Sequence, residues 1–419
     1  GEINATTGDG IEAFRNEITN ASGKMYLKAT GTLNNNAKII GGNLYIGENT
    51  TSANTITAKP ESIAADKTEI YATNTLKLTT GTLGVAIEGA GTLKISENVE
   101  AAAQYIQAGT NTIDENQQLI LTGKARTDAL GTLSKDITGS GTTIVKAGNT
   151  ITAEAMINSA KLYVQSTGTL NIDVDRLGDG LGTAGLTNDG VIGISANGTD
   201  DDAVSHPNST DTLQITLTDG TGTNGTILFN AGTGKTIHAD ADKILTTKNQ
   251  VVSGTLDLTG GTLIRTLDQG ATAGTVEISK TVQIGSSGTA GNIKNLNTTI
   301  DSTGTLTLSN GTISGGTLKI DSGILNQIGG VLSDTITSSG TITLSEGTIS
   351  GDITANTGTI NQTGGLISGK ITNSNIINVS GGTALTEIIN TGIINATTGD
   401  VVAAFRNEII NTGGKVYLK

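Results

Sequence analysis

The stretch 304–322, GTLTLSNGTISGGTLKIDS, contains three short runs in which apolar and polar residues alternate. Leu306 and Leu308 mark the first run, Ile313 the second, and Leu318 and Ile320 the third, with Gly, Asn or Ser at the breaks. Alternation with a period of two residues, bounded by turn-forming residues, is typical of β-strands. The stretch therefore predicts three short strands that are joined by tight corners.

The same pattern recurs through the C-terminal part of the chain. The copies follow one another at steps of 19, 17, 18, 17 and 17 residues and begin at Gly304, Gly323, Gly340, Gly358, Asn375 and Gly392. One copy cannot bury its Ile, Leu and Val side chains alone, whereas stacked copies make a continuous apolar column. We therefore predict an all-β fold, a right-handed parallel β-solenoid with rungs of roughly 18 residues, the handedness following the usual sense of parallel crossovers.

The inward positions of these rungs should form the core. Slim branched side chains fit such positions, and Gly and Asn suit the corners because they tolerate a positive φ or bond the backbone. We expect six side chains to be buried in stacked columns: Ile313, Leu318, Ile320, Ile349, Ile353 and Ile360.

The pattern continues upstream with less regular spacing. On this basis the chain divides into a solenoid with irregular rungs (1–174), an acidic excursion rich in Gly and Asp (175–211), a second stretch of solenoid (212–303) and regular rungs (304–419). We expect 175–211 to be the most irregular part of the chain.

Composition excludes several classes of function. The chain has 59 Gly in 419 residues, 2% aromatic residues, no Trp, no Cys and a net charge of −13. An acidic chain without a basic run is a poor partner for nucleic acid. The absence of Cys excludes disulfides and Cys-ligated metals. No apolar run reaches the 18 or so residues of a membrane helix, and no signal peptide is present.

Residues 1–28 and 392–419 are near-copies of each other. They agree at 20 of 28 positions without a gap, at an offset of 391 residues. Neither end contains a recognisable cap, although bare rungs invite the addition of further strands. We expect the chain to be one long repeat plus an overlap, taken from a longer protein with this period. The alternative is a free subunit that polymerises head to tail.

Part of this repeat departs from strand character. In GDGIEAFRNEI the residues Ile11, Phe14 and Ile18 lie at i, i+3 and i+7, with Asp9 and Glu12 placed as N-cap and capping-box partner. We predict a short helix at 9–18 and again at 400–409. The helix either covers the side of the coil, which we favour, or is a docking knob that recurs once per long period.

Catalytic and nucleotide-binding motifs fail on inspection. NAGTGKT (230–236) has Phe229 where a phosphate loop needs Gly, and GLGTAG (180–185) is not followed by a helix. His206 lies beside Pro207 in a predicted loop, and His238 is predicted to be an outward strand residue. We expect no enzymatic activity and no cofactor, with calcium as the one ion considered.

The calcium candidates lie in and beside the acidic excursion. Hard cations need several oxygen ligands at once, and six carboxylates are the candidates: Asp173, Asp175, Asp179, Asp200, Asp201 and Asp202. Leu177 occupies a position that an EF-type loop fills with Asp or Asn. The alternative, which we favour, is a solvated acidic loop.

The GTLxLxxGTIxG rungs of 304–391 resemble the β-helical stalks of bacterial surface proteins, namely autotransporter passengers and adhesins of the filamentous-haemagglutinin type. This resemblance implies secretion to the bacterial cell surface and structural or adhesive work. We expect a segment of a long extracellular fibre, stalk or sheath built from tandem repeats, whose partner is itself along the fibre axis. The alternatives are an adhesin that presents loops to a host or neighbouring-cell ligand, and a polysaccharide-degrading β-helix.

Overall fold

The structure is a computed structural model. It describes residues 1–48, 52–123, 130–178, 181, 186–196, 213, 216–218, 225–270, 274–384, 386–397 and 408–418. The chain divides into two compact units. Unit 1 comprises residues 1–193 and 214–225, and unit 2 comprises residues 194–213 and 226–419.

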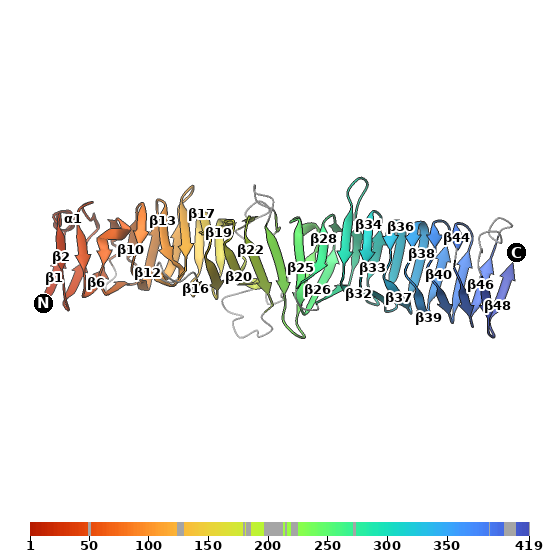
Figure 1. Ribbon diagram of the computed structural model, residues 1–419. Coiled ribbons are helices and arrows are strands. Elements are labelled where there is room, and N and C mark those ends of the chain that lie inside the picture. The colour runs from red at the N-terminus through yellow and green to blue at the C-terminus, as the bar shows by residue number, and fades with distance from the viewer. Residues whose placement is uncertain are drawn as a thin grey trace. The chain divides into compact units, whose positions relative to one another are not determined.

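Unit 1 consists of short parallel strands on three sides of a coil (Figure 1). The largest sheet contains β1 (Glu2–Ala5), β3 (Lys24–Leu27), β4 (Gly31–Thr32), β6 (Asn43–Ile46), β7 (Thr55–Ala58), β9 (Lys67–Ile70), β10 (Thr75–Leu78), β11 (Gly81–Leu83), β12 (Ile87–Ile95), β13 (Val99–Ala102), β14 (Ile106–Ile113), β15 (Gln118–Thr122), β17 (Ile137–Val145), β19 (Ile157–Val164) and β21 (Leu186–Asn188). The other strands are β2 (Glu17–Thr19), β5 (Lys38–Ile40) and β8 (Ile63–Ala64), and β16 (Leu130–Leu133), β18 (Thr150–Ala153) and β20 (Thr169–Asp173). Its helical turns are α1 (Gly8–Glu12), η1 (Pro60–Ser62), η2 (Ala103–Tyr105) and η3 (Val174–Arg176).

Unit 2 contains two sheets of parallel strands, and the first sheet combines two adjacent columns of the coil. The first contains β23 (Thr226–Asn230), β25 (Lys248–Ser253), β27 (Thr262–Leu263), β28 (Thr266–Gln269), β30 (Thr281–Ile284), β31 (Gly291–Lys294), β33 (Thr305–Leu308), β34 (Gly311–Ser314), β36 (Ile324–Leu332), β38 (Thr341–Ile349), β40 (Thr359–Gln362), β41 (Leu366–Ile367), β43 (Ile376–Val379), β44 (Thr383–Ala384), β46 (Ile393–Ala396) and β48 (Lys415–Leu418). The second contains β24 (Thr236–Asp240), β26 (Thr255–Gly260), β29 (Thr275–Ile278), β32 (Asn297–Ile300), β35 (Thr317–Ile320), β37 (Thr335–Ser338), β39 (Ile353–Asn356), β42 (Ile371–Asn373), β45 (Ile388–Asn390) and β47 (Ile409–Asn411). The single 3₁₀ turn that the structure describes in this unit is η5 (Ala241–Lys243), and β22 (Val191–Ser195) spans the sequence boundary of the two units.

Each turn of the coil places like residues beside like residues. Between β43 and β46, Ile377 pairs with Ile394 and Asn378 with Asn395, 17 residues later. Because strand side chains alternate between faces, this register keeps every inward Ile in one column. Both units are right-handed parallel β-solenoids, and the predicted fold class is confirmed.

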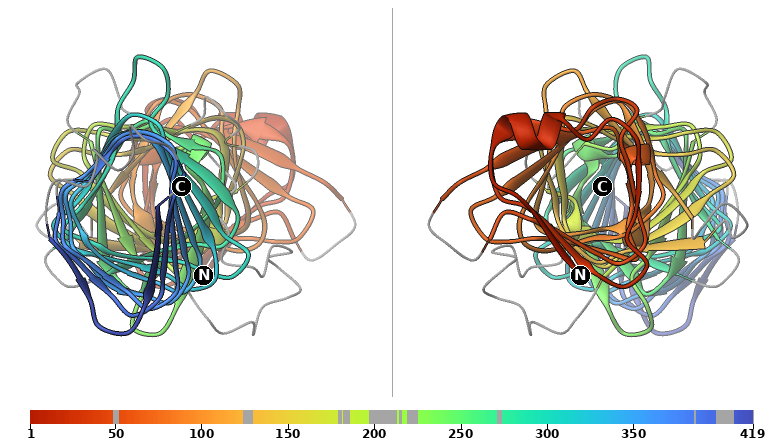
Figure 2. Two further views of the ribbon diagram at one scale, coloured as in Figure 1. Left: turned by 90° about the vertical axis from the view of Figure 1, so that its right-hand side faces the viewer. Right: turned by 90° about the vertical axis from the view of Figure 1, so that its left-hand side faces the viewer.

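The predicted core is confirmed. All six of its members are at most 1% exposed, namely Ile313, Leu318, Ile320, Ile349, Ile353 and Ile360. The views of Figure 2 show the strands of each unit wrapped around the interior that such side chains fill. Burial of one Ile or Leu contributes about 1.5–3 kcal/mol, so the column of inward residues is the main stabilising feature of the coil.

The predicted helix is much shorter than expected. α1 spans Gly8–Glu12, and its N-cap is Thr7, whose side chain accepts from the backbone N–H of Gly10, rather than Asp9. Ile18 lies in β2, which pairs with β5. A nearby strand therefore competes successfully with the helical pattern after Glu12. α1 lies at a corner of the coil (Figure 2).

The second copy of the helix lies largely outside the described residues, which omit 398–407. Ile409 belongs to strand β47, so a helix ending at 409 is wrong.

The predicted acidic excursion is not a continuous loop. η3 ends in it, and the strands β21 and β22 lie inside 175–211. β21 pairs in parallel with β19, as a regular rung does. Residues 179–180, 182–185 and 197–212 lie outside the described part of the chain.

Candidate functional site

Two of the predicted calcium ligands form a turn. The Asp173 carboxylate is 7% exposed and accepts from the backbone N–H of Asp175 at 3.2 Å, as the N-cap of η3. Asp179, Asp200, Asp201 and Asp202 lie outside the described residues. Within the described ranges, no three acidic or histidine side chains converge as a metal-binding group. The structure therefore gives Asp173 a local role as a cap.

The same Asp-capped 3₁₀ turn occurs a second time, in unit 2. Asp240 caps η5 by accepting from the backbone N–H of Asp242 at 3.0 Å. Asp242 in turn accepts from the N–H of Thr262 at 2.9 Å, at the start of β27 in the next turn of the coil. The sequences DVDR (173–176) and DADK (240–243) share this pattern. Comparison of these two segments was a signal that could have identified the cap from sequence.

Glu61 of η1 makes the same kind of bond to the next turn of the coil as Asp242 does. Glu61 accepts from the N–H of Thr82 at 2.5 Å, at the start of β11. In both cases a Gly-Thr-Leu segment follows the acidic turn, and the glycine, Gly81 or Gly261, has a positive φ and lies against the acidic side chains. An added Cβ would overlap those side chains. The acidic corner and the glycine together fix where the next strand begins.

A cluster of ionisable side chains in unit 2 surrounds Asp257. Its carboxylate is 4% exposed and lies 2.8 Å from Nδ1 of His238, one turn earlier. It also accepts from the backbone N–H of Ser279 at 3.2 Å and from its hydroxyl at 2.8 Å. His238 is an outward residue of β24, as predicted, and Glu277 lies beside Asp257 in register. His206 lies outside the described residues.

This cluster has two carboxylates on adjacent turns, the arrangement that a polysaccharide-degrading β-helix would need. Burial raises the pKa of Glu277, and the neighbouring Asp257 and Asp301 raise it further. The oxygens of Asp257, however, already accept bonds from His238 and Ser279. A carboxylate engaged in this way is a poor nucleophile or base, because it must first lose those bonds. The geometry favours a structural link between three turns.

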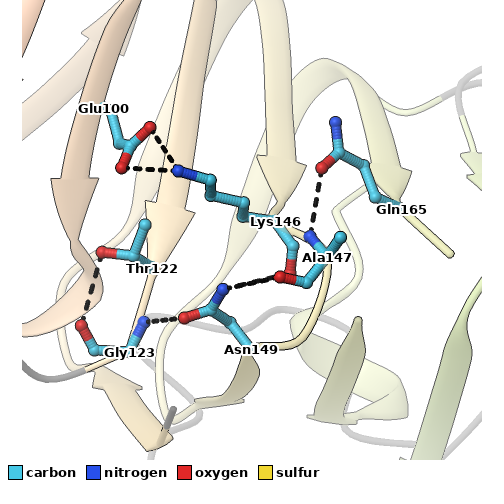
Figure 3. A network of polar contacts seen from close by, with 7 residues as sticks. All are labelled: Glu100, Thr122, Gly123, Lys146, Ala147, Asn149 and Gln165. Carbon is cyan, nitrogen blue, oxygen red and sulfur yellow. Dashed lines mark hydrogen bonds and ion pairs between the residues drawn. The ribbon is translucent and has the colours of Figure 1, made fainter. Parts of the chain in front are cut away.

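Corners of unit 1 carry a comparable polar network (Figure 3). The ammonium of Lys146 lies 2.8 and 2.7 Å from the two carboxylate oxygens of Glu100. Asn149 accepts from the N–H of Gly123 at 2.9 Å and donates to the carbonyl of Ala147 at 2.9 Å. The Asn149–Gly123 bond joins adjacent turns, and the Lys146–Glu100 ion pair spans two turns, from β13 past β15 to the end of β17. These contacts therefore hold the stacking of the coil.

The repeated ends of the chain pair their strands in the same register. β1 pairs with β3 so that Asn4 lies beside Tyr26. β46 pairs with β48 so that Asn395 lies beside Tyr417. The offset between the two pairs is 391 residues, the offset of the sequence repeat. Residues 1–28 and residues 392–419, which we call the end modules, therefore have the same strand arrangement.

The two copies of this module differ in which edge is covered. β6 covers β3, and Leu27 is 0% exposed, whereas the equivalent Leu418 on β48 is 55% exposed. β43 covers β46, and Ile394 is 0% exposed, whereas the equivalent Ile3 on β1 is 38% exposed. Each copy thus supplies the neighbour that the other copy lacks.

No family model, curated protein or solved structure matches the chain. Among the residues that the structure describes, none of the helices has the length and apolar character of a membrane span.

Proposed function

We propose that the chain is a structural segment of a long extracellular bacterial fibre, stalk or sheath, built from tandem β-solenoid repeats of about 391 residues. The observation that carries the proposal is the shared register of the Asn4–Tyr26 and Asn395–Tyr417 pairs. Its mechanism is mechanical, because main-chain ladders and an apolar column resist extension, and length grows with the number of turns.

Overlap of the two end modules produces an unbroken coil. If 392–419 of one period is 1–28 of the next, β43, β46, β48 and β6 become four successive strands of one column. The steps between them are 17, 22 and 19 residues, each close to one turn. In such a junction the end module is covered on both sides, as Ile394 is by β43 and Leu27 is by β6 in the present structure.

End-to-end contact of separate subunits fits less well. If β1 of one chain lay on β48 of another, no strand would lie on β47 at that level, because β2 belongs to the following turn together with β3. One position of the coil would stay unfilled and its backbone groups unpaired, which is costly. We therefore favour a single long chain over a polymer of subunits.

The composition is compatible with the proposed extracellular location. A Cys-free chain with few aromatic residues can be lengthened by duplication without disulfide pairing errors. The adhesin and the polysaccharide-degrading enzyme stay predictions from sequence, the first because residues 197–212 lie outside the described part of the chain.

Two tandem chains test the proposal. The overlapped chain joins residues 1–391 to a second copy of 1–419, and the end-fused control joins 1–419 directly to 1–419. In the control only five residues lie between Tyr417 and the next Asn4, too few for a turn. We expect electron microscopy to show the overlapped chain as a rod that is longer than the single chain by on the order of 100 Å, at about 4.8 Å per turn.

Hydrogen exchange provides the second measurement. In the overlapped chain the peptide that contains β1 should show two populations, since one copy is an edge and the other is covered by β43. In the end-fused control the strands on both sides of the join should exchange fast, because no turn connects them. A compact overlapped chain, or equally fast exchange of both β1 copies, would contradict the proposal. In native material, a denatured mass far above 42.2 kDa supports the long chain.

A further inference from the structure

One outer face of unit 2 carries two columns of uncharged side chains. The columns run along β30, β33, β36, β38, β40, β43 and β46, and we call this surface the Thr/Asn face. The first column is Thr281, Thr305, Ile324, Thr341, Thr359, Ile376 and Ile393, and the second is Gln283, Thr307, Asn326, Thr343, Asn361, Asn378 and Asn395. None of these side chains is fully buried.

One member of the face, Ile324, is an exposed apolar residue, and two more lie further along its strand, outside the two columns. Ile324 is 40% exposed, and Ile328 and Val331 on the same strand are 47% and 38% exposed. These three are among seven exposed large apolar side chains in the described residues, and Ile3, Tyr417 and Leu418 of the end modules are three of the others. Within the Thr/Asn face Ile324 is thus the exposed apolar residue, whereas Val331 lies beside Thr312 and Thr348 in the neighbouring column.

Part of the face is held rigid. Asn378 donates from Nδ2 to Oδ1 of Asn361 at 2.9 Å, and Asn395 donates to Asn378 at 2.9 Å. Side chains that are already fixed lose little conformational entropy when they meet a partner. The outer face is therefore prepared for contact with a regular surface.

Charge identifies the partner. The chain has a net charge of −13, so two copies repel each other over most of their surfaces. From β30 to β46 the two columns of the Thr/Asn face contain no ionisable side chain. Glu346 lies beside Ile328, and Lys415 of β48 follows Ile393 at the end of the first column. Two like faces can therefore approach with little repulsion, which favours a second copy of this chain over a charged ligand.

The size of the face sets the strength of the contact. Seven strands at about 4.8 Å, and four residues of about 3.3 Å along each strand, give a footprint on the order of 400 Å². A stable pair of proteins buries about 800 Å² per partner. One contact is thus weak, but it recurs in every period of a tandem chain, and linked contacts reinforce one another.

We propose that the Thr/Asn face is a lateral interface, through which two solenoids pack side by side with like faces together. This inference rests on the proposed function, because the repeated periods supply the number of contacts that make the pairing stable. Fibres would then pair with each period in register, and the like-face contact would be closed after two copies.

Single cysteines in a Cys-free chain test this pairing. Thr307→Cys, Ile324→Cys and Thr343→Cys are placed one at a time in each period of the overlapped tandem chain. The cross-linker is a bis-maleimide with an arm of about 10 Å, the spacing of packed sheets. Thr337→Cys is the matched control, because Thr337 is exposed on β37 and lies beside Lys319 on a different face. We expect intermolecular dimers at one or more positions of the Thr/Asn face, and none from the control.

A second substitution tests the role of charge. Thr343→Lys, added to the Ile324→Cys chain, should reduce the cross-linked fraction at least to the level of the control, while Lys at Thr337 should leave it unchanged. The proposal is wrong if no position on the face gives dimers, if Thr337→Cys gives as many, or if Thr343→Lys has no effect. Straight rods of the expected length that fail to cross-link would refute lateral pairing alone, whereas the loss of the rods themselves would refute the tandem coil.

Discussion

Asn373 donates a hydrogen bond from Nδ2 to Oδ1 of Asn390, one turn further along the coil, at 2.8 Å. Asn356 makes the same bond to Asn373 at 2.8 Å, and Asn390 makes it to Asn411 at 2.9 Å. The first three of these side chains are completely buried. A line of amides thus runs along the coil axis at the corner where β39, β42, β45 and β47 end, and each of its bonds pairs a side-chain donor with an acceptor one turn further on.

Removing one amide from this line should be costly. Asn373→Ala leaves Nδ2 of Asn356 without that acceptor and Oδ1 of Asn390 without that donor, and we expect a loss of about 2–4 kcal/mol. Hydrogen exchange of β42 and β45 is the suitable measurement, because a repeat protein opens locally. Asn378→Ala in the half-buried outer ladder is the control and should cost less than about 1 kcal/mol. Equal costs would contradict the argument.

The apolar column makes a second prediction. Ile353 is 0% exposed, so Ile353→Ala leaves a cavity and should destabilise its turns by about 2–5 kcal/mol. Ile324→Ala removes the same atoms from a side chain that is 40% exposed and should change stability by less than about 1 kcal/mol. Urea-induced unfolding of both variants would show the difference, and similar midpoints would mean that the column is not the main source of stability.

Asp334 should make the fold less stable as pH rises. Its side chain is 2% exposed, and one oxygen accepts from the N–H of Gly316 at 2.9 Å. Burial raises the pKa of this carboxyl, against the smaller opposing effect of that bond. The folded state therefore holds the proton more tightly than the unfolded state, whose pKa is about 3.9. The contribution of Asp334 to stability is complete below that pH and is lost as the pH rises through the folded-state pKa.

The measurement for Asp334 compares unfolding free energies between pH 4 and pH 8. Asp334→Asn keeps an oxygen that can accept from Gly316 and removes the titrating group. The unfolding free energy of the variant should therefore rise relative to that of the wild type as the pH rises. Asp352→Asn, at an exposed corner where Asp352 accepts from the N–H of Lys370 at 2.8 Å, is the control. A gap between Asp334→Asn and the wild type that stays constant with pH would refute the assignment.

Gly261 and Gly234 separate crowding from backbone strain. Their φ angles are +76° and +74°, so alanine at either position costs about 1–2 kcal/mol in the left-handed region. A Cβ on Gly261 would overlap the Asp240 carboxylate that caps η5, whereas nothing lies near a Cβ on Gly234. Gly261→Ala should therefore cost about 1 kcal/mol more, the value of a helix cap. Thermal unfolding of the two variants tests this prediction. An equal loss of stability in both would show that the Asp240 side chain moves aside without a measurable cost.

The regular rungs could be predicted because their signal is local and repeated. Alternation in TLTL and TITL places Leu306 and Ile342 inward whatever the neighbouring strand is, and the short step between copies requires that they stack. The match of 1–28 with 392–419 likewise predicted two modules that pair their strands alike.

Other features depended on which segments meet. The pattern at 9–18 is helical by itself, yet Glu17–Thr19 becomes β2 because Ile39 of β5 lies beside Ile18 and supplies backbone partners. Asp173 and Asp175 look like ion ligands in sequence, whereas a 3₁₀ turn makes Asp173 a cap for its neighbour. The link between Asp257, His238 and Ser279 joins residues about twenty positions apart, through the register of three strands.

The amino-acid sequence by itself determined the alternation, the repeat lengths and hence the parallel coil, because side-chain direction in a strand follows from local backbone geometry. The tertiary structure alone decided where α1 ends, how Asp257 links three turns and which edges of the end modules are covered. Those outcomes depend on hydrogen bonds between different turns, whose partners are set by strand register rather than by neighbouring residues in the chain.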